Sequence, residues 1–400
     1  MEFQDLLILV LFVSAVAIGW WLGRREKAKY SEPENTQPDY FSGVNYLLND
    51  EKDEAIDSLV GVLEKNSDSL DTHLLLAHML RRRGQMERAI DIHQNLLAKF
   101  TLTELEANKV SLELARDYIS VGLYDRAEGL LLQELDSGVG DQKHCFQSLL
   151  DIYQETKEWG RAIEVSERLI GRGGAFWRNF WSKPKYLDDR LKRSVAHFYC
   201  ELALEYTAGG DVRTAKKQLK RALGIDAESV RASMQLAQID MAGGDYRAAI
   251  KRLNQIRKQD AVLFSEALPL LTKCYQQLGD EQGLFDQLRQ YSVEVPSTPL
   301  DRLVGEMLQS REGDEAAIQF FVAELKKRPS LDQAEALLSL LANRGDSAIE
   351  TVHKVVKGLL GDKSRYLCQN CGFTGTHLHW KCPSCKQWGA VKPVTAVDLV

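Results

Sequence analysis

A spacing of 34 residues between similar segments is the feature that most constrains how this chain can fold. Each copy has a small residue, an aromatic residue or Leu three positions later, and often a Gly four positions after that. An Ala follows five positions beyond the Gly, and usually an apolar residue four positions further on. Ala203 and Ala237 begin two such copies, 34 residues apart. A fixed period of this length predicts a stack of similar structural units.

The copies cover most of the chain and resemble the tetratricopeptide repeat (TPR) family. In chain order they comprise Gly43, Tyr46, Ala55 and Leu59; Ala77, Leu80, Gly84 and Ala89; Ala115, Tyr118, Gly122, Ala127 and Leu131; a weaker copy with Leu150, Tyr153 and Ala162; Ala203, Tyr206, Gly210, Ala215 and Leu219; Ala237, Gly244, Ala249 and Leu253; and Tyr275, Gly279, Leu284 and Leu288. After Asp301 the pattern fades into helical segments without clear spacing.

Each copy predicts a pair of helices. The Gly ends the first helix, and the second helix begins a few residues later. The small residues lie where the two helices cross, so that their backbones approach closely. Because one pair cannot bury its own apolar face, successive pairs must stack. We therefore expect an all-α TPR superhelical solenoid over residues 39–360, with an irregular helical bundle as the alternative.

One interruption separates the fourth and fifth copies, which stand 53 residues apart instead of 34. The surplus lies at about residues 171–189 and interleaves aromatic with basic side chains. These are Phe176, Trp177, Phe180 and Trp181 among Arg172, Arg178, Lys183 and Lys185. Such a mixture suits a membrane interface or a protein partner. The alternative is a long loop folded back over the solenoid.

An uncharged apolar segment near the N-terminus predicts a membrane anchor in residues 1–23. Leu6 to Gly23 contains no charged residue, and 18 helical residues span roughly 27 Å, enough for a hydrocarbon core. Trp20 and Trp21 stand at one end, where indole rings favour the headgroup level. A cleaved signal peptide is the alternative, but basic residues do not precede the apolar segment.

The flanking charges predict on which side the rest of the chain lies. Acidic residues precede the anchor, and Arg24, Arg25, Lys27 and Lys29 follow it. By the positive-inside rule, everything after Arg24 is then cytoplasmic, with residues 24–38 as a polar linker. The scattered Cys145, Cys200 and Cys274 agree, since they suggest buried free thiols in a reducing compartment.

Four cysteines at the C-terminus predict a metal site. Cys368 and Cys371 form one Cys-x-x-Cys pair, Cys382 and Cys385 form another, and ten residues separate the pairs. Two such turns, or knuckles, make a tetrahedral four-sulfur site for one metal ion. The pairs resemble those of rubredoxin, in a domain of residues 364–392. Zinc and iron both suit four thiolates, so the sequence leaves the metal open.

The residues around the cysteines complete this small domain. Phe373, Leu378 and Trp380, with Trp388, can supply a small apolar core and short strands. We do not expect His377 and His379 to be ligands, because four thiolates already saturate a tetrahedral site. A closed site also argues against metal-dependent hydrolysis.

Other function classes find little support. The net charge of −6 disfavours a dedicated nucleic-acid binder. Gly171 to Gly174 lacks the preceding strand and the Lys-Ser/Thr tail of a phosphate loop. The remaining histidines have no metal or triad spacing and are expected to pack or to lie on helix surfaces: His73, His78, His93, His144, His197 and His353. We therefore expect a protein that is not an enzyme.

The combination of anchor, repeats and knuckles resembles the lipopolysaccharide assembly protein B family of Gram-negative bacteria. The stretches that carry the resemblance are Gly23–Arg25, Gly43–Tyr46, Gly122–Glu128, His197–Leu204, Cys274–Gly279, Cys368–Phe373 and Cys382–Cys385. The aromatic and basic insertion departs from the shorter loop that the resemblance leads us to expect.

The resemblance implies a role that composition alone does not. Family members restrain lipopolysaccharide synthesis by helping a membrane-bound ATP-dependent zinc metalloprotease to degrade the lipid A pathway deacetylase. An inner-membrane sensor protein antagonises them. The family's metal cysteines correspond to Cys368, Cys371, Cys382 and Cys385, with iron as the implied metal. An assembly platform for lipopolysaccharide-synthesis enzymes and a redox sensor are the alternatives. The oligomeric state, including a homo-oligomer, stays open.

Overall fold

The computed structural model describes residues 70–99, 101–138, 141–169, 189–361 and 365–394, with Tyr46, Ser58 and Val60 as isolated positions. The predicted anchor and linker, the first repeat apart from Tyr46, and the insertion apart from Asp189 lie outside these residues. Among the helices of the described ranges, none combines the length and apolar character that crossing a membrane requires. The chain divides into two compact units, residues 1–152 and 153–400.

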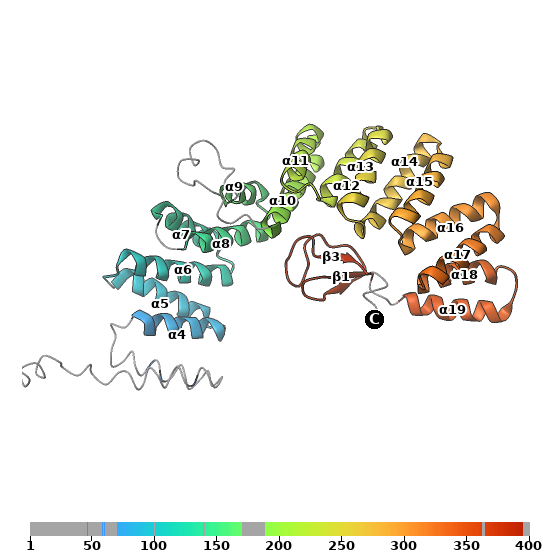
Figure 1. The fold of residues 1–400 in the computed structure, drawn as a ribbon. Coiled ribbons are helices and arrows are strands. Elements are labelled where there is room, and N and C mark those ends of the chain that lie inside the picture. The colour runs from blue at the N-terminus through green and yellow to red at the C-terminus, as the bar shows by residue number, and fades with distance from the viewer. Residues whose placement is uncertain are drawn as a thin grey trace, which may run out of the picture. The chain divides into compact units, whose positions relative to one another are not determined.

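The first unit consists of antiparallel helix pairs. Its helices are α4 (Leu70–Arg82), α5 (Met86–Lys99), α6 (Glu104–Ser120), α7 (Tyr124–Ser137) and most of α8 (Gln142–Glu155). α4 packs on α5, and α6 packs on both α5 and α7 (Figure 1). The small residues of the repeat pattern, Ala77 and Ala89, are fully buried between the helices. The predicted pairing is confirmed here.

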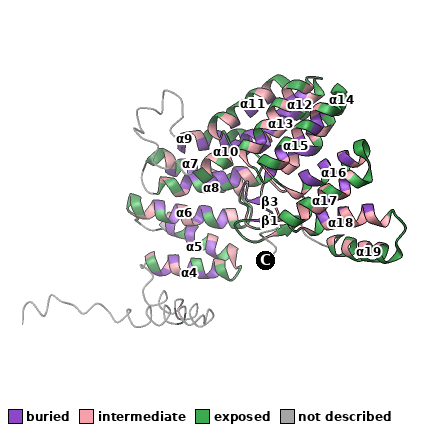
Figure 2. Cartoon of the chain, turned by 45° about the vertical axis from the view of Figure 1, so that its right-hand side comes forward, coloured by how far each residue is buried: buried purple, intermediate pink, exposed green. Residues whose placement is uncertain are grey.

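The second unit continues the pairs and ends in a small sheet. Its helices are α9 (Trp159–Leu169), α10 (Asp189–Ala208), α11 (Val212–Ile225), α12 (Val230–Ala242), α13 (Tyr246–Gln259), the 3-10 helix η1 (Leu263–Ala267), α14 (Leu268–Leu278), α15 (Glu281–Glu294), α16 (Thr298–Glu312), α17 (Asp314–Lys327), α18 (Leu331–Ala342) and α19 (Ser347–Gly361). One apolar core runs from Val230 in α12 to Leu340 in α18. Figure 2 shows buried residues through α10 to α15, whereas α19 has none.

The turn inside each pair follows one chemistry. Gly244 has φ +79°, in the left-handed region that glycine enters without strain, and it ends α12. Asp245 then caps α13, because its side chain accepts a hydrogen bond from the Ala248 N–H at 3.0 Å. In the weaker fourth copy, Lys157 takes the glycine position and has φ 61°. The turn therefore persists where its usual residue is missing.

The array also continues past Asp301, where the sequence pattern fades. The buried Ala317 in α17 follows Gly305 in α16 after 12 residues, as Ala249 follows Ala237. A Cβ added at Gly305 would lie 2.1 Å from the ring of Phe321 in α17, so the two helices cross very closely there. α16 and α17 therefore form a pair of the same kind, and α18 and α19 form another.

The C-terminal domain contains the short strands that the sequence predicted. They are β1 (Tyr366–Cys368), β2 (Thr374–Gly375) and β3 (Val391–Pro393), in the order β2-β1-β3. Both neighbours are antiparallel to β1, with Leu367 opposite Thr374 and Lys392. The sheet places Cys368 at the end of its central strand, which positions the first cysteine pair.

Candidate metal centre

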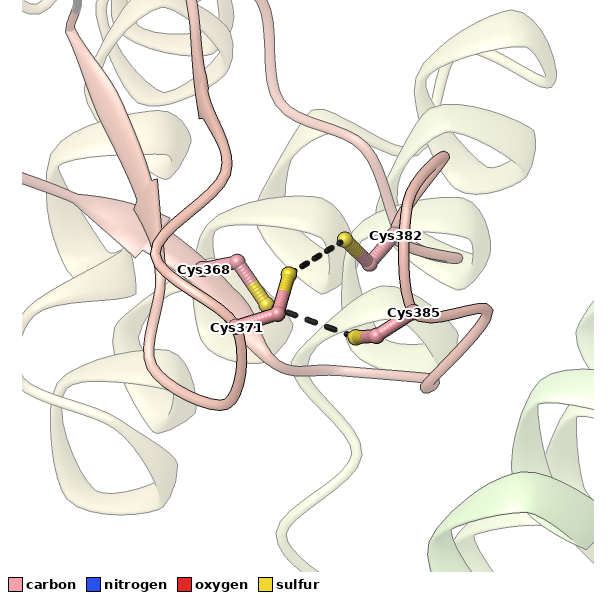
Figure 3. A group of neighbouring side chains, drawn as sticks. All are labelled: Cys368, Cys371, Cys382 and Cys385. Atoms are coloured by element: carbon pink, nitrogen blue, oxygen red, sulfur yellow. Dashed lines mark hydrogen bonds between the residues drawn. The ribbon is translucent and has the colours of Figure 1, made fainter. Parts of the chain in front are cut away.

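The four C-terminal cysteines converge on one point (Figure 3). Their sulfur atoms all lie within 4.8 Å of one another. The Sγ atoms of Cys368 and Cys385 are 3.7 Å apart, and so are those of Cys371 and Cys382. A tetrahedron with metal–sulfur bonds of about 2.3 Å has edges of about 3.8 Å. The side chains therefore fit one tetrahedral metal ion, as the spacing predicted.

The two knuckles have matching backbones. Gly372, directly after the first pair, has φ 74°, and Lys386, directly after the second pair, has φ 60°. The N–H of Gly372 donates to the Cys368 carbonyl at 3.0 Å, and that of Lys386 donates to the Cys382 carbonyl at 3.0 Å. The left-handed residue folds each turn so that both of its sulfurs face the same point. Lys386 adopts this conformation despite its Cβ, which costs about 1 to 2 kcal/mol.

The four thiols differ in burial and acidity. Cys368 and Cys382 are buried, Cys385 is half-buried and Cys371 is exposed. The backbone N–H of Gln387 and the side chain of Asn370 lower the pKa of Cys385 to about 6. A backbone hydrogen bond from Phe373 also lowers the pKa of Cys371. Burial instead raises the pKa of Cys382 to about 11. The solvent-facing side of the site therefore ionises readily, whereas a metal cation would compensate the buried charge of Cys382.

The two nearby histidines stand apart from the sulfur cluster. His377 Nδ1 forms a 2.8 Å hydrogen bond with the Thr376 hydroxyl, and the ring of His379 packs edge-on against Phe373 at 6.0 Å. Among the described residues, the group of side chains arranged to hold a metal at this site is the four cysteines. The donor set is thus four thiolates, which supports one metal ion and suits zinc and iron equally.

The cysteine domain packs against the repeats through Trp388. This side chain is buried. Its ring lies 6.0 Å from each of the rings of Trp159 and Phe198, both edge-on, and stacks on His197. Its indole N–H donates to the Gln154 side chain at 2.7 Å. We expected Trp388 to help form the knuckle domain's own core; that was wrong in part, because the residue packs on α9 and α10 instead.

Arg231 of α12 lies over two of the knuckle tryptophans. Its guanidinium carbon is 5.9 Å from the ring centre of Trp380 and 5.8 Å from that of Trp388. Arg231 also donates to Glu201 at 2.9 Å, and its side chain is only 7% exposed. Burial, followed by the positive charge of Arg231, lowers the pKa of His197 to about 3. His197 is therefore a neutral packing residue, as the sequence predicted.

Polar pairs at the edges of the interface also hold the knuckle domain against the repeat helices. The Tyr366 hydroxyl donates to Glu266 of η1 at 3.0 Å, and burial beside that carboxylate raises the pKa of Tyr366 to about 12. Lys392 pairs with Asp260 after α13, and Lys381 pairs with Glu155 at 3.3 Å. The knuckle domain thus contacts α8 to α10 and α12 to η1. No spacing in the sequence indicated these pairs.

The other cysteines are not part of a site. Cys145, Cys200 and Cys274 are buried free thiols, as expected. Burial raises the pKa of Cys145 to about 11 and that of Cys200 to about 12. Thiols of this kind are weak nucleophiles at neutral pH.

Comparison with known families agrees with both parts of this architecture. A model described as the rubredoxin metal binding domain matches residues 366–393. Models of the tetratricopeptide repeat match residues 72–99 and 206–274. Among solved structures, the MamA protein aligns with 50% of this chain and 95% of its own, at 18% identity and a TM-score of 0.34.

Two curated relatives match nearly end to end. Lipopolysaccharide assembly protein B of Escherichia coli strain K12 is 35% identical over 98% of this chain and 99% of its own length. This chain belongs to the lipopolysaccharide assembly protein B family. The Haemophilus influenzae member is 30% identical over 98% of both chains. Repeats and knuckles are therefore parts of one family architecture.

Proposed function

We propose that this chain is an adaptor, not an enzyme, that regulates lipopolysaccharide synthesis from the cytoplasmic face of the inner membrane. The observation that carries the proposal is the end-to-end match to lipopolysaccharide assembly protein B. Two features support it. Stacked TPR pairs offer extended surfaces for protein partners. The metal centre has four thiolate donors, which leave no coordination position for a substrate.

In this proposal the adaptor brings the lipid A pathway deacetylase to a membrane-bound ATP-dependent zinc metalloprotease, and an inner-membrane sensor protein opposes it. Leu6 to Gly23 would anchor it as a single span, with the repeats and the iron or zinc knuckle domain in the cytoplasm. The uncharged segment and the basic residues after it support this placement.

The test compares chains in a strain that lacks its own copy of the gene. We expect the full chain to shorten the half-life of the deacetylase. A chain without Leu6 to Gly23 should fold but leave that half-life long. Normal turnover with the anchorless chain would show that membrane attachment is not needed.

A redox sensor is a second candidate, favoured by the exposure of Cys371 and the pKa of about 6 at Cys385. A bound iron with a reversible potential would support it, whereas a colourless zinc protein that ignores oxidants would remove it. Co-purification of biosynthetic enzymes, with deacetylase turnover unchanged on deletion, would favour an assembly platform instead.

A further inference from the structure

The two tryptophans that contact the repeats come from a single hairpin. The Gly389 N–H donates to the Trp380 carbonyl at 2.8 Å, and the backbones of Lys381 and Trp388 pair in an antiparallel β-bridge. The tip of the hairpin is the second knuckle, with Cys382 and Cys385 as ligands. A chain segment of this size has too little core to hold its shape without the metal. A metal bound at the second knuckle would therefore fix the positions of both rings.

The opposite side of the contact includes, beside the rings of Trp159 and Phe198, two buried polar side chains with unpaired atoms. His197 Nδ1 has no hydrogen-bond partner among the described residues, and neither do Nε and Nη1 of Arg231. The faces of Trp380 and Trp388 lie against this guanidinium, which also donates to Glu201 at 2.9 Å. The face of an aromatic ring attracts a cation. A cation that is buried with neither an aromatic face nor water beside it raises the free energy of the folded state. This face of α10 and α12 therefore stays dry only while the tryptophans are in place.

We propose that metal binding and domain docking are coupled, so that Arg231, His197 and Trp159 help to hold a metal they do not touch. The coupling free energy is reciprocal: if docking of the knuckle domain raises the metal affinity by some factor, metal binding raises the equilibrium constant for docking by the same factor. Loss of the metal frees the hairpin, and water then reaches Arg231. The metal state thus decides whether this face of the array is covered. The coupling holds whichever partner the array serves.

The first test measures metal retention in the full chain, loaded with zinc and kept in detergent. A chromogenic chelator reports the rate at which zinc leaves. We expect Arg231→Gln to release zinc roughly 10-fold faster than the native chain, as for other residues that support a site from outside the ligand set. Arg231→Lys, which keeps a cation over the rings, should fall between them.

The control is Arg344→Gln, which breaks an exposed ion pair, at 2.7 Å, between Arg344 in the turn after α18 and Glu315 of α17. It should release zinc at the native rate. Circular dichroism must show native helix content in every variant. Native zinc release from a well-folded Arg231→Gln chain would overturn the coupling.

The second test needs no substitution. Phenylglyoxal modifies accessible arginines, and peptide mass spectrometry locates them. Arg231 should resist modification in the zinc-loaded chain and react after chelation. Arg344, with a side chain 49% exposed, should react in both states. If Arg231 stays protected once the zinc is gone, the knuckle domain remains docked without metal and the proposal is wrong.

Discussion

The indole of Trp388 stacks on the imidazole of His197, with ring centres 5.0 Å apart and planes inclined by 22°. The backbone of the knuckle hairpin comes even closer to His197 at the next residue, Gly389. A Cβ added there would lie 3.2 Å from His197 Nε2. The backbone of the knuckle hairpin therefore lies almost directly on α10. The C-terminal knuckle domain thus packs on a helix that lies far earlier in the sequence.

Removing the ring of Trp388 should release the knuckle domain from the helices. Trp388→Ala deletes three ring contacts and the hydrogen bond to Gln154, and we expect it to weaken docking by about 3 kcal/mol. Limited proteolysis should then cut within residues 365–394 much faster than in the native chain. Trp388→Phe should be cut at an intermediate rate. Native resistance of the Ala variant would contradict the contact.

Losing one ligand should empty the metal site and spare the repeats. We expect Cys382→Ser to lose the metal, because a hydroxyl does not replace a thiolate in a four-sulfur site. Helix content by circular dichroism should stay close to native. Cys145→Ser, at a buried thiol far from the knuckles in sequence, serves as the control and should keep one metal per chain. Full metal content in Cys382→Ser would refute the ligand assignment.

The two knuckle turns predict opposite effects of substitution. Lys386→Gly removes the strain of a left-handed lysine and should strengthen metal retention by about 1 kcal/mol. The substitution also removes the ion pair of Lys386 with Glu155. That pair is 4.0 Å long and lies on the surface, so its loss changes the stability of the site little. Gly372→Ala should weaken retention by about 1 kcal/mol. Chelator competition measures both, and equal effects of the same sign would not fit the observed backbone.

The same Gly→Ala change should have opposite signs at two helical positions. Gly305→Ala places a methyl group against the Phe321 ring and should destabilise the second unit by about 1 to 3 kcal/mol. Gly358→Ala, in the exposed interior of α19 with nothing within 4 Å, should stabilise it by about 0.5 to 1 kcal/mol. Urea unfolding followed by circular dichroism compares the two variants.

Asp301 should give the array a recognisable pH dependence. Burial raises its pKa to about 6, although Arg328 and Gln333 hold its carboxylate at 2.8 Å. The folded chain then binds more protons than the unfolded chain between about pH 4 and pH 6, so this group lowers stability as the pH rises through that window. Asp301 should therefore lower Tm as the pH rises from about 4 to about 6. The Asp301→Asn variant should lack this contribution to the pH dependence of Tm. Identical pH profiles for both chains would argue against the assignment.

The spacing of Ala, Gly and apolar residues was enough to predict the helix pairs, because each pair depends on contacts between residues close in sequence. The pattern faded after Asp301 since the aromatic and turn residues change there. Gly305 and Ala317 nevertheless keep the 12-residue interval that marks a helix crossing. That interval was the signal that could have identified the pair α16 and α17.

The four-sulfur site was also predictable, since the geometry of each knuckle is local. Its docking was not. Trp388 and Gln154 are 234 residues apart, and Lys392 and Asp260 are 132 apart. Pairs of this kind depend on tertiary packing between residues far apart in the chain, and they leave no periodic trace in a single sequence. The membrane anchor and the insertion stay predictions.

The separation between Trp388 and Gln154 also sets an order of events during synthesis. At about 5 to 20 residues per second, the helix side of this contact emerges from the ribosome roughly 10 to 50 seconds before the tryptophan that covers it. Every nascent chain therefore passes through a stage with Arg231 and Trp159 open to water. A chain that terminates early never leaves that stage. Closure of this face thus requires that the knuckle hairpin has been synthesised.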